Sequence, residues 1–214
     1  MTLSIIFLIL IFQVLTIYLD NKTNMLDFFY RIQKGKVADA YTNRGITLTI
    51  SRTLFFAVPP LLGFLILNVN KDQIENLMIV VVVINFTITF LQGYLYCKYF
   101  NKNIFKLIID MGSVYKKFSF YVGVLAFMFF LITPYLLNYL ALIYPNDGIW
   151  IVQLNAVFNS FLTLYVIWIF EPRIAKKIDK KNPYNDDFFE AIMVRILGRA
   201  LIIFFLIFLF IINS

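Results

Sequence analysis

The stretch ISRTLFFAVPPLLG, residues 50–63, decides how the rest of the chain is interpreted. Apolar residues continue from it almost without interruption to Leu67, which is typical of a helix in lipid. A guanidinium, that of Arg52, stands near its beginning, where a charge is costly and usually faces a cavity or a partner. The proline pair at 59–60 removes backbone donors. The stretch therefore predicts a membrane helix with a kink or break just before the prolines.

The composition extends this prediction to the whole chain. Hydrophobic residues make up 61% of its 214 residues and charged residues 14%, and the mean hydropathy is +0.82. Such a chain is solvated by lipid. Because a span needs roughly 20 apolar residues, the sequence predicts an all-α integral membrane protein, a bundle of six transmembrane helices in a single polytopic membrane domain, 1–214. The expected spans are about 2–19, 45–67, 77–97, 119–143, 149–170 and 193–212.

Lys and Arg are distributed unevenly between the loops. Sixteen of them follow spans 1, 3 and 5, against only Lys71 on the other side. Because cytoplasmic loops carry the excess of Lys and Arg, the sequence predicts that these loops are cytoplasmic and that both termini are outside. The sixteen are Lys22, Arg31, Lys34, Lys36, Arg44, Lys98, Lys102, Lys106, Lys116, Lys117, Arg173, Lys176, Lys177, Lys180, Lys181 and Arg195.

The segment after the first span leaves two arrangements open. The start, MTLS, has no Lys or Arg and no small-residue cleavage site precedes Asp20, so we expect 2–19 to remain as a helix instead of being removed as a signal peptide. Beyond it, the first helix either continues to about Tyr30, with the second beginning near Val37, or is followed by a short amphipathic helix on the cytoplasmic surface.

Three arginines stand inside expected spans. Arg52 lies seven residues in from Gly45, roughly 10 Å along a helix. Arg195 and Arg199 are four residues apart, so they share one face of the last helix. Each could reach the inner headgroups alone, as snorkelling side chains do. Together, at helix N-termini that add positive charge, they predict a substrate site for an anion, because guanidinium forks match phosphate oxygens and a diphosphate suits a cluster best.

Polar uncharged residues form two stripes at helical spacing. Asn85, Thr89 and Gln92 share one face of the third span, and Asn155, Asn159 and Thr163 share one face of the fifth. They could be interhelical hydrogen-bond partners, which membrane bundles use commonly, or a polar groove leading outward from the arginines. Glu171 closes the fifth span on its cytoplasmic side and could be the charge partner of one arginine or a simple helix-end residue.

Residues of the common catalytic and metal sites are missing. The chain has no histidine and one cysteine, Cys97, so it lacks the commonest general base, the commonest transition-metal ligand and any multi-cysteine site. Neither a glycine-rich phosphate loop nor a paired-aspartate motif occurs. We therefore expect no catalytic residues, no metal and no cofactor. Because the basic loops act as topology determinants, the net charge of +7 needs no nucleic acid to explain it.

Both ends of the chain resemble a known family. YRI at 30–32, LTISRT at 48–53 and PLLG at 60–63 resemble the N-terminal third of the Amj family of lipid II flippases. NAVFNSFLTLYVIWIFEPRIAKKID at 155–179 and FFEAIMVRILGRAL at 188–201 are similar to its C-terminal third. The resemblance implies a protein of the bacterial cytoplasmic (inner) membrane that moves lipid II, an undecaprenyl-diphosphate-linked peptidoglycan precursor, to the outer leaflet.

Three functions remain in competition at this point. The first is a flippase that binds lipid II or a related polyprenyl-diphosphate lipid at Arg52, Arg195 and Arg199. The second is an integral-membrane enzyme acting on a prenyl phosphate, which would need a nucleophile or metal-binding acids near the same arginines. The third is a scaffold for an envelope complex that transports nothing. Six helices are few for enclosing a large headgroup, which weakly favours a homodimer.

Overall fold

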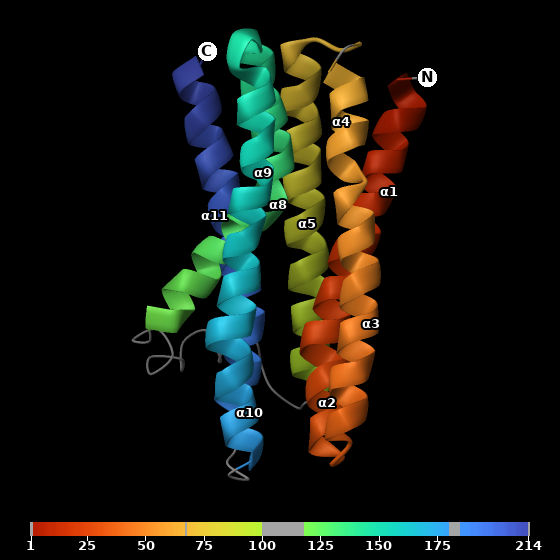
Figure 1. Ribbon diagram of the computed structural model, residues 1–214, viewed down its shortest axis with the longest axis vertical. Coiled ribbons are helices and arrows are strands. Elements are labelled where there is room, and N and C mark those ends of the chain that lie inside the picture. Colours follow the sequence, from red (N-terminus) through yellow and green to blue (C-terminus); the bar gives the residue numbers. More distant parts are fainter. Residues whose placement is uncertain (1, 67, 100–117, 180–184, 214) are drawn as a thin grey trace.

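The computed structural model describes residues 2–66, 68–99, 118–179 and 185–213, and this part of the chain is helical (Figure 1). Successive helices run up and down one bundle, with both termini and the α4–α5 connection at one end and the α2–α3 turn at the other. The elements are α1 (Thr2–Asn21), η1 (Lys22–Asp27), α2 (Phe28–Gln33), α3 (Val37–Phe56), α4 (Val58–Ile66), α5 (Lys71–Tyr99), α8 (Phe118–Ile143), η2 (Pro145–Asp147), α9 (Gly148–Leu164), η3 (Tyr165–Phe170), α10 (Glu171–Asp179) and α11 (Asn185–Asn213).

Several helices are long and apolar enough to cross a membrane. Among the described residues there are three such segments, Thr2–Asn21, Val37–Ile66 and Lys71–Lys98, and four if the two arms of α8 are taken as one bent span. The expected spans 149–170 and 193–212 coincide with α9 plus η3 and with α11, which are not among the candidate spans of the described residues. The chain is thus an all-helical membrane protein, and the count of six spans stays a prediction.

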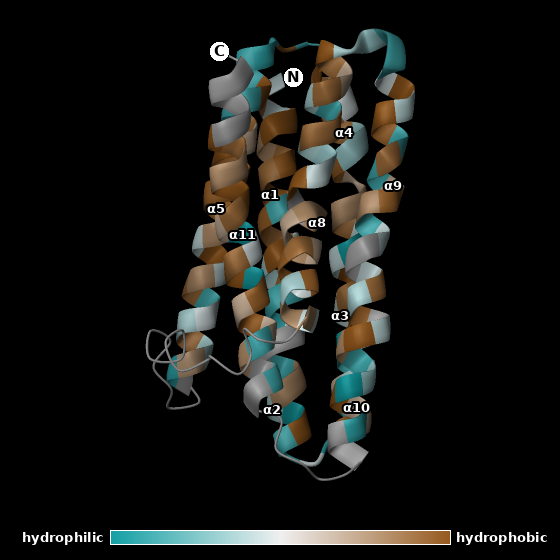
Figure 2. Cartoon of the chain, turned by 90° about the vertical axis from the view of Figure 1, so that its left-hand side faces the viewer, coloured by the Kyte–Doolittle hydropathy of each residue, from teal (hydrophilic) through white to brown (hydrophobic). Residues whose placement is uncertain are grey.

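Basic residues gather toward the end of the bundle that holds the α2–α3 turn. Figure 2 shows hydrophobic colours over most of α1, α4, α5 and α11, and hydrophilic colours on α10 and on the neighbouring part of α3. Lys71 begins α5 at the opposite end. Of the sixteen basic residues, six lie outside the described residues. These are Lys102, Lys106, Lys116, Lys117, Lys180 and Lys181.

The first helix continues well beyond its apolar part. α1 passes through the π-helical segment η1 into α2, and both junction residues, Asn21 and Asp27, have helical dihedral angles. The helix ends in a turn where Gly35 has φ +72°, a conformation that glycine adopts without a Cβ penalty. α3 begins at Val37. The first of the two arrangements left open by the sequence is therefore the one found.

Prolines interrupt two of the helices. α3 gives way to α4 at Val58, one residue before the proline pair, as expected. In α8, Pro134 cannot donate a hydrogen bond to the carbonyl of Phe130, and the two arms of the helix meet at 51° just before it. The two breaks lie together, because the ring of Phe55 on α3 stacks on that of Phe130 with centroids 4.5 Å apart.

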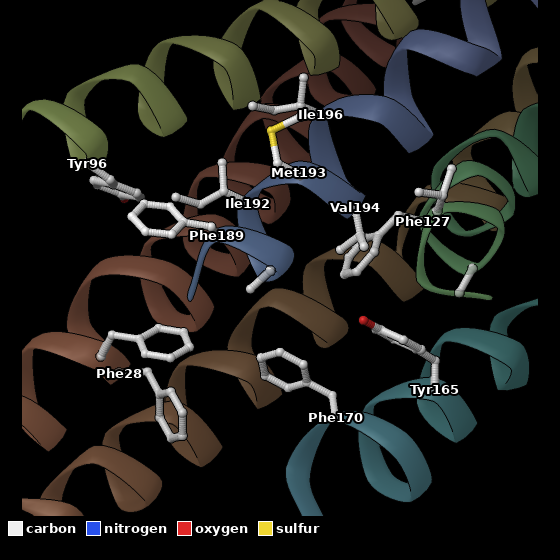
Figure 3. Close-up of a cluster of buried hydrophobic side chains, with 14 of the residues drawn as sticks. Phe28, Tyr96, Phe127, Tyr165, Phe170, Phe189, Ile192, Met193, Val194 and Ile196 are labelled. Carbon is white, nitrogen blue, oxygen red and sulfur yellow. The ribbon is translucent and has the colours of Figure 1, made fainter. Parts of the chain in front are cut away.

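The buried apolar side chains form two clusters along the bundle. One is largely aliphatic and lies between α1, α4, α5, α8 and α11 toward the termini. The other is rich in aromatic rings and joins α2, α5, α8, η3 and α11 toward the opposite end (Figure 3). Phe28, Phe127 and Phe170 belong to this aromatic cluster. Its rings form the surroundings of the charged residues described below.

Gly198 allows α11 to approach α8 closely. A Cβ there would lie 2.7 Å from the backbone oxygen of Val124 and 3.0 Å from the backbone nitrogen of Met128.

We expect Gly198→Ala to destabilise the protein by about 1–3 kcal/mol, because the backbones of both helices must move apart. Thermal unfolding in detergent measures this. Gly63→Ala, where no atom lies within 4 Å of the new Cβ, is the matched control and should leave the melting temperature unchanged or raised; equal melting of both variants would contradict the prediction.

Candidate functional site: a buried arginine cluster

Four arginines from two helices gather toward the end of the bundle that holds the α2–α3 turn. Arg44 and Arg52 come from α3, and Arg195 and Arg199 from α11. Arg44, Arg195 and Arg199 are only 3%, 4% and 1% exposed, and Arg52 is half-buried. The charge of Arg195 acts on each of the other three. The structure thus brings together the three arginines singled out from the sequence and adds Arg44, which sequence reasoning had assigned to a loop.

The carboxylate of Asp20, on α1, lies among these four guanidiniums. Its Oδ2 atom is 3.5 Å from Nε of Arg195, and its charge also acts on Arg44, Arg52 and Arg199. Asp20 is 5% exposed. Sequence reasoning did not single it out, because hydropathy places it at the end of the first span. The signal that could have found it is an acidic residue closing an apolar helix that continues.

Arg44 is held by a carboxylate and by aromatic rings. One of its terminal nitrogens lies 3.0 Å from Oε1 of Glu171, the residue with which α10 begins after the π-helical segment η3. The guanidinium also lies 4.9 Å from the ring centroid of Phe28 and 6.0 Å from that of Phe170. Such cation–π contacts stabilise a desolvated guanidinium. Glu171, which the sequence offered as a charge partner for one arginine, is thus the partner of Arg44.

Arg52 differs from the other three in what it contacts. Its guanidinium lies 4.5 Å from the ring centroid of Phe130, at the bend of α8. Arg195 stacks in the same way on Phe127, at 4.3 Å, but also pairs with Asp20. Arg52 forms no ion pair with any residue in the described part of the chain. Its charge is therefore the one most available to a ligand.

A groove of about 580 Å³ opens beside Arg52. One wall comes from α3 and the other from α9, η3 and the first residue of α10. Its polar lining residues are Thr49, Arg52, Thr53, Thr163 and Glu171, and its apolar ones are Leu48, Phe56 and Val166. The volume is in the range of small-molecule sites. The groove offers a cationic group, hydroxyls and an apolar wall, which together suit an amphiphile with an anionic head.

The polar stripe of α5 is buried against α1. Nδ2 of Asn21 donates to Oγ1 of Thr89 at 3.2 Å and to Oε1 of Gln92 at 2.7 Å. Oδ1 of the same Asn21 accepts a hydrogen bond from Arg199 at 3.2 Å. Asn85, one turn before Thr89, is 1% exposed, and both amide atoms of its side chain lack a partner within the described residues. The stripe links α1 and α5 to the arginine cluster through interhelical hydrogen bonds.

The polar stripe of α9 lies elsewhere. Asn159 donates to Oδ1 of Asn155 at 3.2 Å on the same helix. Thr163, one turn further, is exposed and lines the groove that also holds Arg52. The structure therefore does not bring the two stripes together: only Thr163 of the six stripe residues lines this groove, whereas the α5 stripe is covered by α1.

A second charged group lies beside the arginine cluster and was missed by sequence reasoning. Nε of Arg173 is 2.9 Å from Oδ1 of Asp187, and one terminal nitrogen is 2.9 Å from Oε1 of Glu190. The other terminal nitrogen donates to Oγ of Ser119 at 2.9 Å. These contacts join α10, α11 and α8. The sequence offered little indication of this charged group, because acidic residues and basic turns near helix ends are common.

The geometry of the arginine cluster allows binding of an anion. Groups of three or more His, Cys, Asp or Glu that could hold a metal ion do not occur within the described residues. No protein-family model, no curated protein and no solved structure matches this chain significantly. The function therefore has to be argued from the site.

Proposed function

We propose that this protein is a flippase that moves lipid II, or a closely related polyprenyl-diphosphate lipid, from the inner to the outer leaflet of the bacterial cytoplasmic membrane. The observation that carries the proposal is the buried arginine cluster beside a groove that contains Arg52. A diphosphate has the charge and the oxygen atoms that such a cluster would bind bidentately. The resemblance of both chain ends to the Amj family supplies the identity of the lipid.

The charge balance of the cluster favours a bound anion. Within the described residues, the four guanidiniums face two carboxylates, those of Asp20 and Glu171, which leaves a formal charge of +2. One positive charge remains if the Arg173 group, with its two carboxylates, is counted as well. A guanidinium without compensation inside a membrane costs on the order of a few kcal/mol. An anion at this place offsets that cost.

The proposal includes the topology expected from the sequence. Six spans would be formed by α1, by α3 with α4, by α5, by α8, by α9 with η3, and by α11, with the α2–α3 turn in the cytoplasm and both termini outside. The cluster then lies toward the cytoplasmic leaflet, at the level where a lipid presents its phosphates. The groove beside Arg52 takes the headgroup, and the polyprenyl chain stays in the bilayer next to the apolar residues Leu48 and Phe56.

A flipping assay with purified protein tests this function. Vesicles of phosphatidylcholine containing the protein and an NBD-labelled lipid II are exposed to dithionite, which bleaches only the outer leaflet. We expect the bleached fraction to rise above that of protein-free vesicles for labelled lipid II but not for NBD-phosphatidylcholine. A bleached fraction that stays at the level of protein-free vesicles for both lipids would contradict transport and favour a scaffold. Release of phosphate from undecaprenyl diphosphate would instead identify an enzyme.

A further inference from the structure

We propose that Asp20 is the built-in counter-anion of the arginine cluster and that the diphosphate of the ligand takes its place. The inference rests on the proposed function, because it describes how the same site binds and releases its anion. It also assigns a role to a residue that is neither a ligand-binding cation nor part of the groove.

The carboxylate of Asp20 lies farther from Arg195 than the neighbouring carboxylates lie from their arginines. Its distance to Arg195 is 3.5 Å, whereas Glu171 lies 3.0 Å from Arg44 and Asp187 lies 2.9 Å from Arg173. Charge-assisted hydrogen bonds of good geometry are shorter than 3 Å. Asp20 nevertheless is buried, so it cannot exchange this contact for water. A carboxylate in such a position neutralises the cluster without occupying all of its donors.

Several donors of the cluster remain for a larger anion. The guanidinium of Arg199 is buried, and its Nε atom has no hydrogen-bond partner among the described residues. Arg52 has no ion pair there either. One carboxylate has two oxygens, which cannot satisfy four guanidinium forks. A diphosphate has more acceptor oxygens and more charge, so it can bridge several guanidiniums at once.

The charges of the cluster make binding and release a competition. Without ligand, the carboxylate of Asp20 reduces the repulsion that Arg195 exerts on Arg44, Arg52 and Arg199. When a diphosphate binds, like charges repel the carboxylate from the guanidiniums. When the carboxylate of Asp20 returns to the guanidiniums, it helps the ligand to leave. A transporter needs such release, whereas a storage site does not. Removal of this one negative charge should therefore tighten binding and slow release.

The test compares the wild-type protein with Asp20→Asn and Asp20→Glu in detergent, with Asp72→Asn as a control at an exposed position near the other end. Three probes are titrated: farnesyl diphosphate, inorganic pyrophosphate and farnesol. We expect Asp20→Asn to bind both diphosphates about tenfold more tightly, because one competing unit charge is removed at short range. Farnesol binding should not change, and Asp20→Glu and Asp72→Asn should bind like the wild type. In the flipping assay, Asp20→Asn should be slower.

The outcomes separate this inference from the proposed function. If the folded wild type binds neither diphosphate, the anion site and with it the flippase proposal are wrong. Binding of pyrophosphate without farnesyl diphosphate would refute a lipid ligand but leave the counter-anion role. If the wild type binds and Asp20→Asn binds equally or more weakly, only the counter-anion role is refuted. An Asp20→Asn protein that melts early and is restored by pyrophosphate supports it, and one that stays unfolded at saturating pyrophosphate overturns it.

Discussion

Arg52→Ala is expected to lower transport by about two orders of magnitude, since under the proposed function it removes two charge-assisted hydrogen bonds to a phosphate. The protein should still fold, because Arg52 forms no ion pair with a described residue and its removal leaves no carboxylate without a cation. Arg52→Lys keeps the charge but loses the planar fork and much of the stacking on Phe130, so we expect a partial defect.

Complementation of a flippase-deficient strain measures this effect, with protein level and membrane insertion followed in parallel. Lys36→Ala, at an exposed position of the α2–α3 turn, is the matched loss of one positive charge and should complement fully. Arg199→Ala is a less clean test, because Arg199 is buried and bonded to Asn21. Full complementation by Arg52→Ala at normal protein level would mean that Arg52 only reaches the headgroups and that the ligand binds elsewhere.

Arg52, Arg195 and Arg199 could be singled out from two properties of the sequence. These are the helical spacing of residues and the free-energy cost of a charged side chain inside a membrane span. Helical spacing fixes which residues share a face, and the positions of the helix ends fix depth. The shared face and the depth both depend only on the local sequence, so they could be predicted before the fold was known. The break before the proline pair was predictable for the same reason, since proline acts on its own helix.

The partners of these arginines could not be read in the same way. Asp20 and Arg44 belong to helices that continue beyond their apolar parts, and hydropathy ends a span where the apolar residues end. What keeps these helices together is packing between distant segments, such as the two hydrogen bonds that join Thr16 of α1 and Ser51 of α3, at 3.0 and 3.4 Å. The partner of each polar stripe depends likewise on how neighbouring helices are rotated, which spacing within one helix does not determine.

Arg173→Met is expected to destabilise the protein by about 3–5 kcal/mol, the cost of breaking a buried ion pair by removing one partner. Arg173 contacts Asp187 and Glu190, both 0% exposed, and donates to Ser119. Its loss leaves two buried carboxylates without the cation that both contact. The methionine side chain fills similar space, so the effect reports the charge and its hydrogen bonds.

Thermal unfolding in detergent measures the change, with Lys176→Ala, an exposed position on the same helix, as the control that should melt like the wild type. The triple variant Arg173→Met, Asp187→Asn and Glu190→Gln should recover much of the loss, because no buried charge remains unpaired. Since α10 begins with Glu171, which lines the groove and pairs with Arg44, loosening of α10 should also weaken binding of farnesyl diphosphate. A single variant as stable as the wild type would show that apolar packing alone, such as that of buried Ile174, holds α10 in place.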